Sequence, residues 1–108
     1  MVPRIEVGKL YFISHKYPNT YTKIIKFEDN TPNNWSPQTI LGSLITKDLF
    51  IILDTQEINP YEYSYDDSEK IWLRILFKDT VGWIKADKHE LYEMNPTFFS
   101  ESVYILDH

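Results

Sequence analysis

The sequence predicts an all-β fold, and three observations carry that prediction. Short runs rich in β-branched and aromatic residues recur along the chain, separated by Pro, Asn, Asp and Gly. No apolar pattern with helical spacing persists over three turns. The 108 residues include no Cys and show no internal repeat, so neither disulfides nor repeated units build the fold. We therefore expect one small domain of packed strands.

The first third of the chain predicts two strands and a long loop. Residues 9–14 and 21–27 are β-prone runs, and the residues Tyr17-Pro18-Asn19-Thr20 between them favour a turn. Residues 28–38 contain almost no aliphatic side chain and nearly every loop-forming residue type. This composition predicts a long, exposed loop.

The middle of the chain predicts a buried strand followed by an acidic connection. Residues 39–45 are β-prone, and the continuous apolar run 49–53 is too short for a stable helix. We interpret 49–53 as a central strand buried on both faces. Residues 54–70 are acidic, and Tyr alternates with other residues at 61, 63 and 65, which favours an extended arm or the edge of a hairpin.

The last predicted strands form a hairpin. Residues 71–77 are a strong strand candidate whose odd positions are apolar and form the expected core face. A turn at 78–80 leads to the next strand at 81–84. Asp87 and Glu90 have capping-box spacing, but few residues follow, so we predict a single 3₁₀ turn there.

These elements resemble an SH3-like barrel of the bacterial and phage type. The resemblance rests on W-x-x-I at Trp72-Leu73-Arg74-Ile75, on Gly82-Trp83-Ile84, and on the run that follows the Lys47-Asp48 turn. Leu10-Tyr11-Phe12 stands where the family has its leading strand, and Lys88–Glu93 stands where it has a 3₁₀ turn and a last short strand. The family implies a barrel over residues 1–96, with a C-terminal arm at 97–108.

Two departures from the family pattern bear on function. The first loop is unusually long and contains its own strand or hairpin arm. The segment 86–91 lacks the Pro and Tyr with which eukaryotic SH3 domains hold polyproline ligands.

Composition excludes several classes of protein. The net charge of −5 argues against a general binder of nucleic acid or of an anionic membrane. The charge is uneven, +2 over residues 1–53 and −7 over residues 54–108, so the surface is dipolar. No apolar run approaches the ~18 residues of a membrane-spanning helix, and the first residues lack a signal peptide. We expect cytoplasmic synthesis, followed by incorporation into a virion if the chain belongs to a phage.

No motif of an enzyme stands out. His15, His89 and His108 share no metal-ligand spacing, and three scattered Gly form no phosphate-binding loop. The acidic run 66–69 lacks the order of a calcium loop. We expect no catalytic activity, no cofactor and no metal.

Aromatic residues are the candidates for contact with a partner, because Tyr and Trp give large contact areas at low entropic cost. By analogy with the family, Tyr11, Trp72 and Trp83 would cluster on one face. The alternative is that they cover the core beneath long loops. The full candidate set is Tyr11, Trp35, Tyr61, Tyr63, Tyr65, Trp72, Trp83, Phe98, Phe99 and Tyr104.

The C-terminal arm is the sharpest sign of assembly. Residues 98–106 are apolar and β-prone, so they would pair with a sheet edge, either in their own domain or in a neighbour. The sequence favours a structural or docking subunit of a larger protein assembly, such as a phage tail, neck or baseplate, in an oligomer or hetero-complex. The alternative is a module that binds a peptide or the bacterial cell wall.

Overall fold

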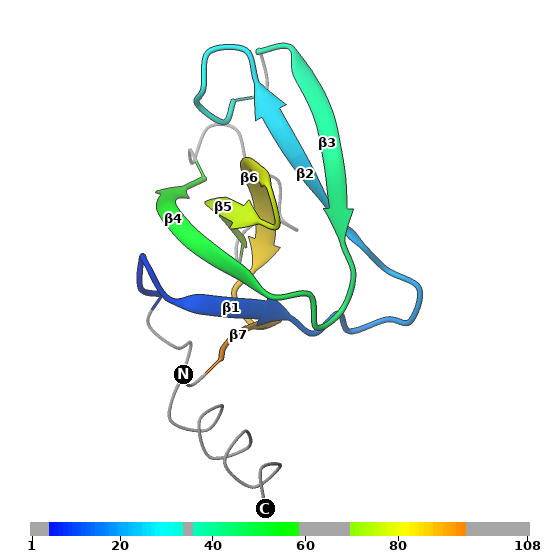
Figure 1. The fold of residues 1–108 in the computed structure, drawn as a ribbon. Helices are drawn as coiled ribbons and strands as arrows, with labels where there is room; N and C mark the ends of the chain where they lie inside the picture. The colour runs from blue at the N-terminus through cyan, green and yellow to red at the C-terminus, as the bar shows by residue number, and fades with distance from the viewer. Residues whose placement is uncertain (1–4, 34–35, 59–69, 95–108) are drawn as a thin grey trace, which may run out of the picture.

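The computed structural model describes residues 5–33, 36–58 and 70–94, and these residues form seven strands without a helix. Figure 1 shows their arrangement. The strands are β1 (Leu10–Ile13), β2 (Thr22–Phe27), β3 (Gln38–Leu44), β4 (Phe50–Glu57), β5 (Lys70–Phe77), β6 (Thr80–Asp87) and β7 (Leu91–Glu93). The prediction of an all-β fold is therefore confirmed. No helix in the described part is long and apolar enough to cross a membrane.

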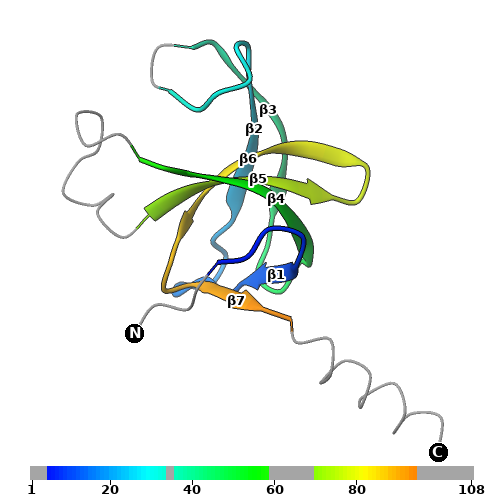
Figure 2. The ribbon, with the colours of Figure 1, turned by 90° about the vertical axis from the view of Figure 1, so that its left-hand side faces the viewer.

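The strands form one antiparallel sheet in the order β3-β2-β6-β5-β4-β1-β7. Within the described residues the sheet does not close, so β3 and β7 are its two edges, whereas we expected a closed barrel. The sheet is nevertheless strongly curled, and β1 with β7 crosses beneath the middle strands (Figures 1 and 2). Leu44 of one edge and Leu91 of the other consequently belong to the same buried cluster.

The main core lies inside this curl. On β5, Ile71, Leu73 and Ile75 are buried while Arg74 is exposed, as the apolar odd positions predict. The cluster comprises Tyr11, Ile13, Ile24, Leu44, Phe50, Ile52, Ile71, Leu73, Ile75, Ile84, Ala86 and Leu91. Because all seven strands contribute to it, this core holds the sheet together.

Strand β4 corrects one expectation. It is central, with β1 on one side and β5 on the other, but it is not buried on both faces. Phe50 and Ile52 are buried, whereas Ile51 and Leu53 are only half-buried. The strand also extends beyond the apolar run to Glu57, so the predicted connection at 54–70 is shorter than we expected.

The hairpin of β5 and β6 is confirmed. Phe77 pairs with Thr80, and Lys78 at the turn adopts a φ of 53°. A positive φ at this position belongs to the turns whose twist matches that of paired strands. After β6 the chain makes a hydrogen-bonded turn at 88–90, the position of the predicted 3₁₀ turn. There the Glu90 N–H donates to the Asp87 carbonyl at 3.0 Å, and the His89 N–H donates to the Asp87 side chain.

A second, smaller apolar cluster lies on the outer face of the sheet. Phe27 is fully buried, yet it lies outside the main core and makes an edge-to-face contact with Trp72 at 5.4 Å between centroids. Pro32, from the loop after β2, is also buried, and its carbonyl accepts a hydrogen bond from the Gln56 side chain at 3.4 Å. The predicted exposed loop therefore packs part of itself against the sheet.

Candidate binding groove

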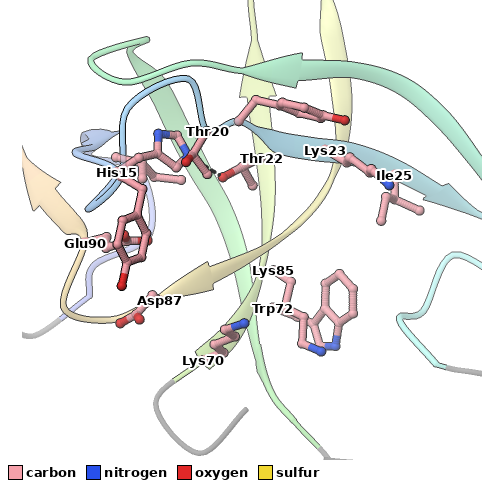
Figure 3. Close-up of a pocket in the computed structure, with 13 residues that line it drawn as sticks. His15, Thr20, Thr22, Lys23, Ile25, Lys70, Trp72, Lys85, Asp87 and Glu90 are labelled. Atoms are coloured by element: carbon pink, nitrogen blue, oxygen red, sulfur yellow. Dashed lines mark hydrogen bonds between the residues drawn. The ribbon is translucent and has the colours of Figure 1, made fainter. Parts of the chain in front are cut away.

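A groove of about 460 Å³ opens on the outer face of the sheet, where the connection between β1 and β2 faces β5 and β6 (Figure 3). Residues from β1, β2, β5, β6 and the neighbouring connections meet there. Its lining is formed by Ile13, His15, Tyr17, Thr20, Tyr21, Thr22, Lys23, Ile25, Lys70, Trp72, Lys85, Asp87 and Glu90. The groove combines aromatic surface with charges of both signs.

Trp72 is the aromatic residue that the sheet positions most firmly in this groove. It alternates with buried Ile71 and Leu73, so its indole must project from the opposite face of β5. Phe27 supports one side of the ring, and the Lys85 Nζ lies 5.8 Å from its centroid. This distance is within the range of a cation–π interaction, so Lys85 both orients the indole and brings a positive charge to it.

Charge is distributed unevenly along the groove. Lys23, Lys70 and Lys85 supply the positive side chains, and Asp87 and Glu90 lie together toward the turn after β6 (Figure 3). The two acidic side chains already accept hydrogen bonds, Asp87 from the His89 N–H and Glu90 from the Lys16 N–H at 2.7 Å. Their carboxylates are therefore partly satisfied within the chain.

The connection between β1 and β2 forms one rim of the groove, and His15 fixes its start. The two ring nitrogens of His15 lie 2.8 Å from the hydroxyls of Thr46 and Thr22. Beyond this anchor, Tyr17 and Tyr21 are 66% and 56% exposed. Sequence reasoning assigned these tyrosines only to a turn and a strand.

The predicted aromatic face is only partly formed. Tyr11 does not lie on an accessible face, because it is 1% exposed and packs in the main core. Its hydroxyl accepts a hydrogen bond from the Glu6 N–H at 2.8 Å. Trp83 is 7% exposed, which agrees with the alternative that it covers the core. Of the three residues expected to share a face, only Trp72 lines the groove.

The remaining candidate contact residues lie outside the described part of the chain. They are Trp35, Tyr61, Tyr63, Tyr65, Phe98, Phe99 and Tyr104. Their assignment to a partner stays a prediction.

Burial raises the pKa of the Tyr11 hydroxyl above 10, and the carboxylates of Glu93 and Glu6 act in the same direction, against the hydrogen bond from the Glu6 backbone. The neutral phenol is thus favoured in the folded state. The raised pKa of Tyr11 contributes to the stability of the fold. This contribution is complete below the unfolded-state pKa of about 10 and is lost as the pH rises through the folded-state pKa.

We expect the Tyr11→Phe variant to lose less stability at alkaline pH than the unchanged chain does. Urea midpoints of both proteins, measured from pH 8 to pH 11, should show a steeper decline for the unchanged chain above pH 10. Parallel declines would contradict the assignment. At pH 8 the substitution should cost about 1 kcal/mol, because the Glu6 N–H loses its acceptor.

The described residues contain no group of three or more His, Asp or Glu side chains that could hold a metal ion. The groove offers an aromatic surface, lysine donors, hydroxyls, the His15 ring and the carboxylates of Asp87 and Glu90.

No family model, curated protein sequence or solved structure matches this chain.

Proposed function

We propose that this protein is a non-catalytic docking subunit of a larger protein assembly, and that it holds an extended segment of a partner protein in the groove over Trp72. The observation that carries the proposal is the aromatic surface of this groove, which joins half-buried Trp72 with exposed Tyr17 and Tyr21 and is lined by three lysines. An extended peptide with carboxylates would match it, because its apolar side chains can cover the indole while its acidic groups meet the lysine ammonium groups.

The arrangement of the strands supports an SH3-like origin for this subunit. The segments that carry the resemblance form five consecutive strands of the sheet, β7-β1-β4-β5-β6. The long first loop contributes the β2–β3 hairpin, which adds to the free side of β6. We propose that the assembly is a phage virion, since that resemblance is to the bacterial and phage type. Detection of the chain by mass spectrometry in purified virions would test this finer proposal.

The experiment for groove binding uses a displayed library of random peptides. Selected peptides are titrated against the full chain and against Trp72→Ala, with Tyr92→Ala as the control. Tyr92 is a half-exposed aromatic residue on β7 that stacks on Phe12, away from the groove. We expect Trp72→Ala to lower affinity at least ~10-fold, in the range of an aromatic hot spot, and the control to change it less than about 2-fold.

Two results would contradict the proposal. The first is selection of peptides whose affinity is the same for the unchanged chain and for Trp72→Ala. The second is co-sedimentation of the chain with purified peptidoglycan in a Trp72-dependent manner, without affinity for any peptide. That outcome would favour the alternative, a cell-wall-binding module.

A further inference from the structure

Edge strand β3 is unusually open to a further strand. Within the described part of the chain it pairs with β2 alone, and its seven residues carry no charge. Ile40 is 60% exposed at its centre. Proteins normally protect long edges with charges, proline or bulges, and β3 has only one such device, the extra residue Leu41 opposite the step from Ile24 to Ile25.

We propose that β3 receives residues 98–106 of a second copy of this chain as an added strand. This inference concerns a surface separate from the groove and does not depend on what the groove binds. The segment, Phe98-Phe99-Ser100-Glu101-Ser102-Val103-Tyr104-Ile105-Leu106, lies outside the described residues, and its sequence carries the argument. Six of its nine residues are aromatic or aliphatic, which suits a strand that is buried against an edge.

Charge favours β3 over the other edge of the sheet. The β2–β3 hairpin has two exposed lysines, Lys23 and Lys26, and no acidic residue in either strand. The only charged residue of the segment 98–106 is Glu101. Edge strand β7 offers only three residues and ends at Glu93, which would repel Glu101.

The course of β7 favours a second copy over the same copy. Leu91 pairs with Ile13, whose carbonyl accepts a hydrogen bond from Lys47 in the connection that leaves β3. Three residues later the Met94 N–H donates to the Leu10 carbonyl, so the chain leaves at the end of β1 far from β3. From the Met94 Cα to the Phe98 Cα an extended chain spans about 13 Å, and retracing β1 from Leu10 to Ile13 uses about 10 Å of it, while residues 45–47 still separate the Ile13 contact from the end of β3.

Complementation between two full-length variants tests the proposal. Ile40→Lys blocks the edge and leaves the segment intact, whereas Ile105→Lys blocks the segment and leaves the edge intact. The mass of each protein is measured by light scattering and sedimentation over a range of concentrations, after circular dichroism has confirmed the fold. Tyr92→Lys and Trp72→Ala serve as controls for the other edge and for the groove.

We expect the unchanged chain and both controls to exceed the monomer mass of 12.9 kDa as concentration rises. Each blocked variant alone should remain at the monomer mass, and an equimolar mixture of the two should give a two-chain species. The proposal is overturned if the unchanged chain is monomeric throughout, if Ile40→Lys associates normally, if Tyr92→Lys abolishes association, or if the mixture stays monomeric. Since Trp72→Ala associates normally under the proposal, failure of groove binding remains distinguishable from failure of this inference.

Discussion

Replacing Gly82 with Ala should destabilise the protein by about 1–3 kcal/mol, the range of an overpacked core. A Cβ at this position would lie 2.6 Å from the Ile24 Cγ2 and 3.2 Å from the Ile25 carbonyl oxygen. Neither atom can move easily, because Ile24 is buried and β-branched, and the carbonyl belongs to strand β2 where it meets β6. Gly82 therefore permits β2 to approach β6 closely at the point where the two strands pair.

Gly42 provides a matched control within the same sheet. It faces the same side chain, but an added Cβ would lie 4.0 Å from the Ile24 Cδ1, an ordinary van der Waals distance. Gly42→Ala should be neutral or stabilise the fold by up to ~1 kcal/mol, because it restricts the unfolded chain. Thermal unfolding should thus separate the variants, with a melting temperature about 5–20 °C lower for Gly82→Ala. Equal shifts in the same direction would contradict the close approach of β2 to β6 at Gly82.

Phe27→Ala should cost about 3–5 kcal/mol, as is usual for the loss of a buried phenylalanine ring. The ring is fully buried, and it connects the β2–β3 hairpin to the outer face of β5 through its contact with Trp72. Such a loss is a large part of the 5–15 kcal/mol that stabilises a typical domain. Urea unfolding measures it directly.

Two further variants separate the role of Phe27 in the groove from its role in stability. Phe27→Leu retains most of the buried volume but removes the edge-to-face contact, so it should cost about 1 kcal/mol, alter the near-ultraviolet circular dichroism of Trp72 and weaken peptide binding. Tyr17→Ala, at an exposed groove position, should change stability by less than about 0.5 kcal/mol. If Phe27→Leu leaves the Trp72 signal unchanged, Phe27 does not position the indole.

The strands were predictable wherever burial alternates along a long run. On β5 the apolar residues at odd positions identify both the strand and its core face, so Leu73 and Trp72 were assigned correctly to opposite sides. Alternation gives no such information on β1, because all four residues of Leu10–Ile13 are apolar or aromatic. Tyr11 was placed on a partner-facing side by analogy with the family, whereas it packs in the main core.

The groove was less accessible to prediction, because it depends on contacts between distant segments. Tyr21 and Lys23 reach it only because β2 pairs with β6, a pairing that involves Ile25 and Trp83. Local sequence patterns cannot reveal such a pairing. The pairing of distant strands also determines which strands, here β3 and β7, become the edges of the sheet. Gly82 stands in a motif that carries the resemblance, but its sequence neighbours do not reveal that the Ile24 side chain approaches it.

The pairing of β1 with β7 has a consequence for how the chain folds. Phe12 and Tyr92 are cross-strand partners although they stand roughly 80 residues apart, so this ladder closes a loop that spans most of the domain. The β5–β6 hairpin, whose partners are neighbours in the sequence, can form early and serve as a template. Docking of β1 and β7 then belongs to the late, slow part of folding, during which hydrophobic strand edges remain open to association with other chains.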